Sequence, residues 1–302
     1  MKTRSKIVFP HTDLACERLA ADTEIPGVEH TEEERRGCRI GRLFVKSREG
    51  AEAIGKPEGT YVTMSFPALY GLNEGGVAPL SETLSELILE FCGRLPARPH
   101  SVLAVGLGNR SMTADAVGPE SIRAMTATRH LRLEDPALFR KFSEVELSLL
   151  APGVMGETGI EAADLVAGAV RATEPDLVIA IDALAARSVT RLATTVQLSD
   201  TGIRPGSGVG NSRRAIDGET LGVPVLAIGI PTVVSSHTLV YDAFGKAGLS
   251  DGEIPKKLRE VLSEGASFFV SPRESDTVTE RAAELVAGAV NMTFSAGFFA
   301  ER

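Results

Sequence analysis

The chain of 302 residues has no tryptophan, only three cysteines, and no apolar run long enough to cross a membrane. Cys16, Cys38 and Cys92 are odd in number and lack the spacing of a metal site, which favours a reducing compartment. The N-terminus is basic, but its apolar run at 7–9 ends at Pro10 and is too short for a signal peptide. We therefore expect a cytoplasmic protein without a membrane partner.

Motifs of several other protein classes are also missing. The net charge of −8 supplies no basic surface for nucleic acid. The histidines are scattered, and neither an H-E-x-x-H zinc motif nor a G-x-x-x-x-G-K-S/T phosphate loop occurs. Gly106 and Gly108 begin a dinucleotide-binding pattern, but Ser111 replaces its third glycine. We expect no cofactor and no nucleic-acid partner.

What the sequence does contain is an alternation of apolar strands and amphipathic helices, clearest over residues 100–235. This alternation predicts the α/β class, with an open, mostly parallel sheet flanked by helices. The predicted strands are 61–64, 102–107, 147–150, 177–181, 192–198 and 223–230. The predicted helices are 81–93, 119–130, 158–172 and 280–292.

Some local signals refine this prediction. Pro231 is expected to end the last strand, because proline donates no ladder hydrogen bond. Thr158 and Glu161 have the form of a capping box, which predicts a helix start. The hexapeptide LVAGAV occurs at 165–170 and 285–290 and predicts two helices that use small residues for close packing.

Two aspartates follow predicted buried strands. Asp115 comes after strand 102–107 and a short loop, and Asp182 comes directly after strand 177–181. Ligands of open α/β sheets bind at the carboxyl ends of the strands, where a carboxylate pair can share a proton and activate water. The alternative is structural: Asp115 would cap the next helix, and Asp182 would bond backbone at a strand end.

Other candidate site residues surround this pair in the sequence. Successive amides of a glycine-rich loop can form an anion or oxyanion site, and a mobile turn is the alternative. Arg187 can orient a substrate or form a surface ion pair. The candidate substrate or oxyanion residues are Asn109, Arg187, Gly206, Ser207, Gly208 and Asn211.

Several stretches together resemble the germination protease family. The longest are VGLGNRSMTADAVGP (105–119), APGVMGETGIEAADLV (151–166), VIAIDALAARS (178–188) and TGIRPGSGVGNSRRAIDGETLGVPVLAIGIPTVV (201–234). Shorter matches are HTDLA (11–15), EGAEAIGKPEGTYVTM (49–64) and FFVSPRESD (268–276).

The resemblance implies an endopeptidase that initiates the degradation of small acid-soluble spore proteins at germination. Its two catalytic carboxylates would be Asp115 and Asp182, and its fold would be similar to that of hydrogenase-maturation endopeptidases. It implies a homotetramer in the spore core, made as a zymogen that cleaves itself between Asp13 and Leu14. Residues 1–13 would then be a pro-segment, and 14–302 a single α/β peptidase domain with an irregular part at 14–98.

The chain departs from the family pattern at two places. Ser235, Ser236 and His237 follow Pro-Thr-Val-Val, where the family usually has aspartate, and the region 237–268 is shorter than usual. Neither change touches the predicted carboxylates, so we expect the chemistry to be kept.

Two other functions remain open from the residues. A metal-dependent peptidase would use Asp115 and Asp182 as ligands together with Glu157 or His237. A nucleotide- or effector-binding module would use the two glycine loops, although their spacing does not match a known phosphate-binding motif.

Overall fold

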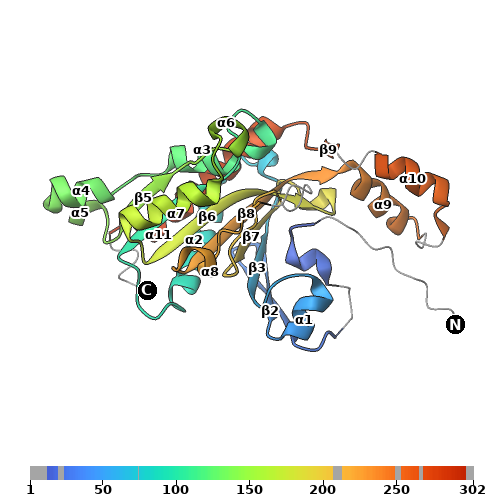
Figure 1. Cartoon of the computed structure of the whole chain (residues 1–302), viewed down its shortest axis with the longest axis horizontal. Coiled ribbons are helices and arrows are strands. Elements are labelled where there is room, and N and C mark those ends of the chain that lie inside the picture. The colour runs from blue at the N-terminus through green and yellow to red at the C-terminus, as the bar shows by residue number, and fades with distance from the viewer. Residues whose placement is uncertain are drawn as a thin grey trace.

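A nine-stranded sheet organises the protein in this computed structural model (Figure 1). The structure describes residues 12–19, 24–73, 75–206, 213–248, 253–264 and 268–296. The strand order is β1-β2-β3-β7-β8-β6-β4-β5, and β9 pairs with β8. No helix in these ranges is both long and apolar enough to cross a bilayer.

The parallel part of the sheet forms its centre. It consists of β8 (Val225–Ser235), β6 (Leu177–Ala186), β4 (Ser101–Gly106) and β5 (Glu146–Leu150). β4, β6 and β8 are almost entirely buried, as their continuous apolar sequences predict for strands covered on both faces. The expected α/β fold with an open, mostly parallel sheet is confirmed for this centre, and the sheet as a whole is mixed.

Antiparallel strands extend the sheet beyond β8. They are β7 (Thr195–Ser199), β3 (Gly59–Ser65), β2 (Cys38–Val45) and β1 (Val28–Arg35), and β9 (Phe269–Val270) pairs with the end of β8. The expectation that 14–98 is irregular was therefore wrong. β1 is acidic and largely exposed, so its composition resembled a solvated segment, although it pairs with β2 along its whole length.

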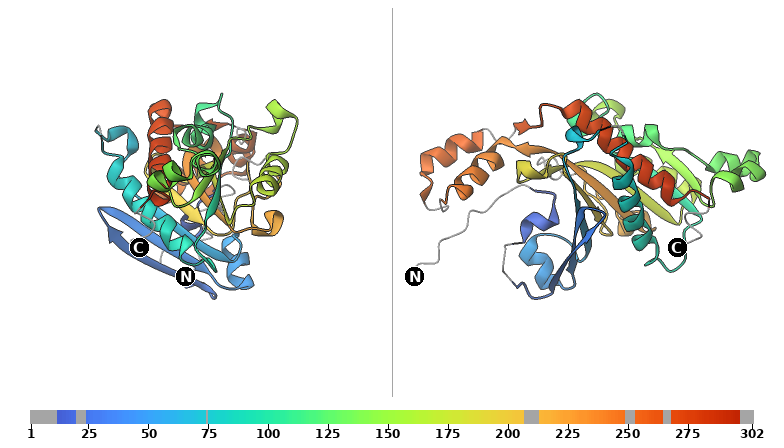
Figure 2. Two further views of the ribbon diagram at one scale, coloured as in Figure 1. Left: turned by 90° about the vertical axis from the view of Figure 1, so that its left-hand side faces the viewer. Right: turned by 180° about the vertical axis from the view of Figure 1, so that it is seen from behind.

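Helices cover both faces of the sheet, and α11 runs across one of them (Figure 2). The α-helices are α1 (Arg48–Ile54), α2 (Ala78–Cys92), α3 (Val117–Ala124), α4 (Arg129–Glu134), α5 (Pro136–Phe142), α6 (Met155–Thr158), α7 (Ala162–Thr173), α8 (Gly218–Leu221), α9 (Ser236–Lys246), α10 (Lys256–Glu264) and α11 (Ser275–Thr293). The short 3-10 helices are η1 (Ala15–Arg18), η2 (Leu69–Gly71), η3 (Thr113–Asp115) and η4 (Val189–Arg191).

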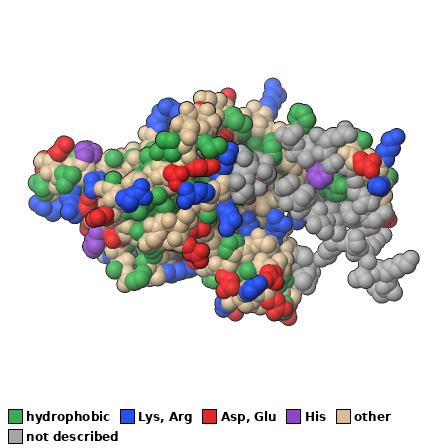
Figure 3. All heavy atoms as spheres, in the orientation of Figure 1, with side chains coloured by type: hydrophobic (Ala, Val, Ile, Leu, Met, Phe, Trp, Pro, Cys, Tyr) green, Lys and Arg blue, Asp and Glu red, His purple; other side chains and the backbone are tan. Residues whose placement is uncertain are grey.

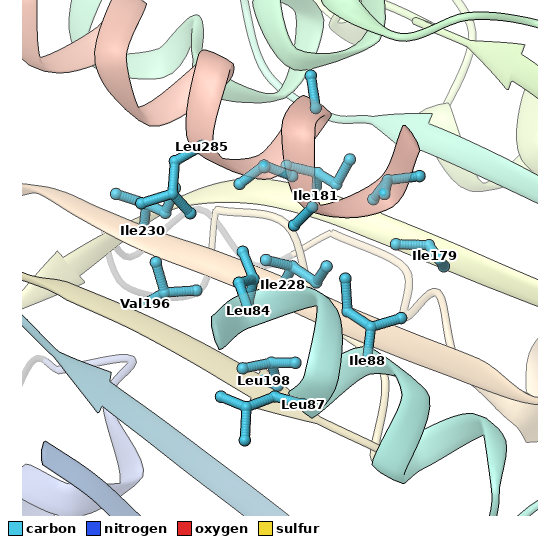
Figure 4. Packing of buried hydrophobic residues seen from close by; sticks show 14 of the residues in the cluster. Leu84, Leu87, Ile88, Ile179, Ile181, Val196, Leu198, Ile228, Ile230 and Leu285 are labelled. Carbon is cyan, nitrogen blue, oxygen red and sulfur yellow. The ribbon is translucent and has the colours of Figure 1, made fainter. Parts of the chain in front are cut away.

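Alternate residues of β6 point into two separate cores. Ile179 and Ile181 pack with α2 and α11 on one face, and Val178 and Ala180 pack near α7 on the other. Figure 4 shows the first core, where side chains of α2 and α11 meet those of β6, β7 and β8. Each fully buried Leu or Ile stabilises the fold by roughly 1.5–3 kcal/mol, so these cores hold the strand ends in place.

The sequence predicts that β8 ends at Pro231. In the structure the strand continues to Ser235. Leu184 of β6 faces Pro231, and the next pair is Ala185 with Val233, so the register shifts by one residue at this point. Such a bulge accommodates a residue that has no N–H to donate.

Two predicted helix boundaries also differ. Helix 119–130 ends at Ala124, because Thr126 and Thr128 are held by hydrogen bonds to Asn291 and to β5. The capping box at Thr158 does not form. Its hydroxyl accepts the N–H of Ile160, and α7 begins four residues later at Ala162.

Candidate active site

A cavity of about 1180 Å³ opens at the carboxyl ends of the parallel strands, where open α/β sheets bind their ligands. Both predicted carboxylates, Asp115 and Asp182, line it. Residues after β4, in the second half of β6 and at the bend of β8 line the cavity on the side of the parallel strands. The topology therefore brings together two acids that are far apart in the sequence.

Asp182 lies inside β6, opposite Gly229 of β8, because the strand continues to Ala186 rather than ending at 181. It is 6% exposed, and its Oδ1 accepts the N–H of Ala183 at 2.9 Å. Burial raises the pKa of Asp182 well above its usual range, and the negative charges of Asp115 and Asp13 raise it further. This carboxyl therefore retains a proton at pH values where an exposed aspartate has lost it.

Asp115 ends η3, and a tight loop holds it. Its Oδ2 accepts the N–H of Asn109 at 2.7 Å. Gly108 makes this contact possible: its φ is +113°, and a Cβ there would lie 2.0 Å from the Asp115 carbonyl oxygen. Burial raises the pKa of Asp115, and the Asn109 hydrogen bond partly opposes the shift. Asp115 does not cap α3, whose N-cap is Ala116 without a side-chain bond.

The η3 loop is also anchored from two other elements. The hydroxyl of Thr232 in β8 donates to the Ala114 carbonyl at 2.6 Å, and the hydroxyl of Thr279 in α11 donates to the Thr113 carbonyl at 2.9 Å. These bonds fix the loop against rigid elements, which keeps Asp115 in the cavity.

Asp13 of the predicted processing site lines the same cavity. The Asp13 N–H donates to the Ala185 carbonyl at 2.8 Å, and the Ala185 N–H donates to Asp13 Oδ2 at 2.9 Å. The side chain of Leu14 is fully buried in an apolar cluster with Leu184, Leu192 and neighbours. Residues 13–14 therefore pass alongside the end of β6 that carries Asp182.

Two residues that the sequence reasoning missed hold this segment. Lys56 Nζ donates to the Asp13 carbonyl at 2.8 Å, and Gln197 Nε2 donates to the same oxygen at 3.2 Å. Gln197 Oε1 also accepts the Ala15 N–H at 2.6 Å. Lys56 lies in the stretch 49–64, one of the stretches that resemble the germination protease family. That resemblance was the sequence feature that could have identified Lys56 as a site residue.

The remaining candidates fall into three groups. Asn109 and Gly206 line the cavity. Arg187 lies outside its wall and bonds Glu17, to which it donates both its backbone N–H and a guanidinium N–H. Ser207, Gly208 and Asn211 lie outside the described residues.

The two alternative metal ligands do not join the aspartates. Glu157 is exposed on α6, and the ring of His237 in α9 packs edge-to-face on Tyr241, with ring centres 4.6 Å apart. Neither lines the cavity. Within the described ranges, no group of three or more His, Cys, Asp or Glu side chains is placed to hold a metal ion.

One face of the molecule carries charges of both signs. On the face that Figure 3 presents, acidic and basic side chains are interspersed among the described residues.

Comparison with known proteins gives a consistent result. The family model described as germination protease matches residues 11–247. The germination protease of Caldanaerobacter subterraneus subsp. tengcongensis is 39% identical over 95% of this chain and 94% of its own length. That of Priestia megaterium is 40% identical over 88% of this chain and 73% of its own.

A solved structure is also similar. The NiFe hydrogenase maturation protease HycI of Thermococcus kodakarensis has a TM-score of 0.36 and 17% identity, and the match covers 68% of this chain and 98% of that one.

Proposed function

This chain belongs to the germination protease family, and from that premise we propose that it initiates the degradation of small acid-soluble spore proteins, with Asp115 and Asp182 jointly activating water. The observation that carries the proposal is the convergence of the buried Asp182 and the half-buried Asp115 on one cavity. Their pKa values are both raised, which suits a pair that works with one shared proton.

The environments of the two acids suggest their roles. Asp182 is the more deeply buried and its pKa is raised further, so it keeps the shared proton, while Asp115 is the base. Asp115 takes a proton from water as the water oxygen attacks the peptide carbonyl carbon. Asp182 gives its proton to the leaving nitrogen, and the C–N bond breaks. Because the two groups are coupled, their titration belongs to the pair.

The proposal includes self-processing. Residues 1–13 are the pro-segment, cleavage falls between Asp13 and Leu14, and 14–302 is the mature peptidase domain. The position of Asp13 in the cavity supports this assignment. We further propose that the enzyme is a homotetramer in the spore core, and that Asn109 and Gly206 contact the substrate.

The test is to hold the purified full chain at mildly acidic pH and to follow its mass. The wild type should lose residues 1–13, whereas Asp115→Asn should remain full length. Glu134→Gln, which alters an exposed acid on α4, is the matched control and should be trimmed at the wild-type rate. If Asp115→Asn still trims itself, Asp115 is not the base.

A second arm of the same experiment addresses metal dependence. Trimming should proceed at the same rate after incubation with a chelator, because the proposed chemistry uses carboxylates alone. Activity that disappears with the chelator and returns with Zn²⁺ would instead favour a metal-dependent peptidase.

A further inference from the structure

The carbonyl of Asp13 is held by two side-chain donors inside the cavity. Lys56 Nζ lies 2.8 Å from this oxygen and Gln197 Nε2 lies 3.2 Å from it. The chain around the carbonyl is extended and paired with β6: the Asp13 N–H bonds the Ala185 carbonyl, and Leu14 has φ −79° and ψ 121°. The Asp13–Leu14 peptide is thus held in an extended conformation at the cavity that Asp115 and Asp182 also line.

The orientation of Gln197 follows from its two partners. Its Oε1 accepts the Ala15 N–H at 2.6 Å, so its Nε2 must be the atom that faces the Asp13 carbonyl. Gln197 is 8% exposed and lies within β7, which holds the amide in place. It therefore bonds the peptide groups on both sides of Leu14, and the first of these is the Asp13–Leu14 peptide.

Lys56 follows α1, directly after Gly55, whose left-handed conformation ends the helix. Burial lowers the pKa of Lys56, and the nearby charge of Asp13 partly restores it. The amine donates to a neutral peptide carbonyl, a bond that strengthens if this oxygen gains negative charge. Donors fixed in advance around such an oxygen are the usual means of stabilising an oxyanion.

We propose that Lys56 and Gln197 form the oxyanion site of this enzyme, an inference that rests on the proposed function. When water attacks the Asp13 carbonyl carbon, a C–O bond forms and the π electrons of the carbonyl move onto its oxygen. Lys56 and Gln197 stabilise that negative charge. The carbonyl then reforms as the C–N bond breaks, and the Leu14 nitrogen leaves with the proton supplied by the aspartate pair.

The two parts of the sheet thus contribute different groups to the proposed reaction. The parallel centre and its loops supply Asp115 and Asp182, and the antiparallel extension supplies Gln197 from β7. Lys56 comes from the segment between α1 and β3 on that same side. Any substrate bound as residues 12–15 are bound would present its scissile carbonyl to the same two donors.

The test compares self-trimming rates of full-length variants by mass spectrometry. Lys56→Met removes the ammonium and keeps the apolar stem. Gln197→Glu keeps an acceptor for the Ala15 N–H but replaces the donor to the Asp13 carbonyl. Each should slow trimming by roughly 10²–10³-fold, the usual cost of removing one oxyanion donor. Lys46→Met, at an exposed lysine paired with Glu29, is the control and should trim at the wild-type rate.

Hydrogen exchange at the Asp13 N–H separates catalysis from docking. This N–H bonds Ala185, so its protection reports whether the segment stays in place. We expect protection to persist in both variants while trimming slows. Wild-type trimming rates, or loss of protection together with trimming, would overturn the oxyanion role. Thermal unfolding shows whether Lys56→Met folds. If it does not, the trimming rate of Gln197→Glu tests the oxyanion role.

The Asp115→Asn chain, assayed in parallel, distinguishes failure of the oxyanion inference from failure of the proposed function. If it stays full length while Lys56→Met and Gln197→Glu trim at the wild-type rate, only the oxyanion inference fails. If Asp115→Asn itself trims, the proposed function fails first.

Discussion

At the scale of single residues, the main feature is the carboxyl group of Asp182, whose ionised form is destabilised by its surroundings. Asp182 is buried inside a strand, near the charges of Asp115 and Asp13, and among the described residues one backbone N–H, that of Ala183, donates to it. Such an environment favours the protonated acid over the carboxylate. Burial of such a carboxyl group reduces the stability of the fold at pH values where the group would ionise in the unfolded chain.

Asp182→Asn should therefore stabilise the protein at neutral pH and abolish trimming. The pKa of Asp182 is raised in the folded state above its ordinary value of 3.8, so the unfolded chain ionises first as the pH rises. The wild type thus loses stability above about pH 4, and asparagine avoids that loss. We expect a gain of about 1–2 kcal/mol at pH 7 that shrinks towards pH 4, measured by urea unfolding.

Glu134→Gln again provides the control, because this exposed acid should change the free energy of unfolding by less than about 0.5 kcal/mol at either pH. A gain for Asp182→Asn that is equally large at pH 4 would mean that the effect is not electrostatic. A loss of stability at pH 7 would contradict the assigned environment of Asp182.

At the scale of elements, the same hexapeptide packs differently in two helices. LVAGAV lies in α7 at 165–170 and in α11 at 285–290. A Cβ at Gly288 would meet the Ser81 Oγ of α2 at 2.8 Å, whereas a Cβ at Gly168 would meet only the Arg171 guanidinium at 3.8 Å. Close packing through small residues is therefore confirmed for α11 and was wrong for α7.

The same substitution should have opposite effects at these two glycines. Gly168→Ala should raise the free energy of unfolding by about 0.5–1 kcal/mol, because alanine is the better helix former. Gly288→Ala should lower it by about 1 kcal/mol or more, because the methyl group forces α11 away from α2. Chemical denaturation of the two variants checks this, and equal shifts in one direction would contradict the packing difference.

At the scale of the whole molecule, residues 12–19 dock against the sheet, and Asp13 lines the cavity. Their docking uses Asp13 on β6, Leu14 in an apolar cluster, and Glu17, whose carboxylate accepts the N–H groups of Arg187 and Ser188. These contacts join residues more than 160 positions apart in the sequence. While Asp13 stays in place, another peptide cannot reach the same donors.

A chain that begins at Leu14 should therefore cleave a peptide of residues 8–19 without a lag. The full-length chain should show a lag that lasts as long as its self-trimming, since Asp13 occupies the Lys56 and Gln197 donors until cleavage. Chromatographic product assays of both chains measure this. A chain lacking only residues 1–6 is the control and should keep the lag. Equal lags in all three chains would exclude the pro-segment role.

The sequence by itself determined the strands of the parallel centre and the positions of Asp115 and Asp182 relative to them. Long apolar runs specify buried strands, and the strand ends of an open α/β sheet meet at one edge. Local sequence patterns gave wrong predictions where contacts with residues distant in the sequence determine the secondary structure. The strand β1 is polar in composition, and the segment after Ala124 follows its bonds to β5 and α11.

Only the tertiary structure decided what surrounds the pair. Lys56, Gln197 and Asp13 meet through hydrogen bonds between residues 43 and 184 positions apart. No periodicity encodes such contacts, because they depend on how β7, β6 and the N-terminal segment are placed by the packing of the whole sheet. The burial that raises the pKa of both aspartates is likewise a property of the assembled fold rather than of any short stretch of chain.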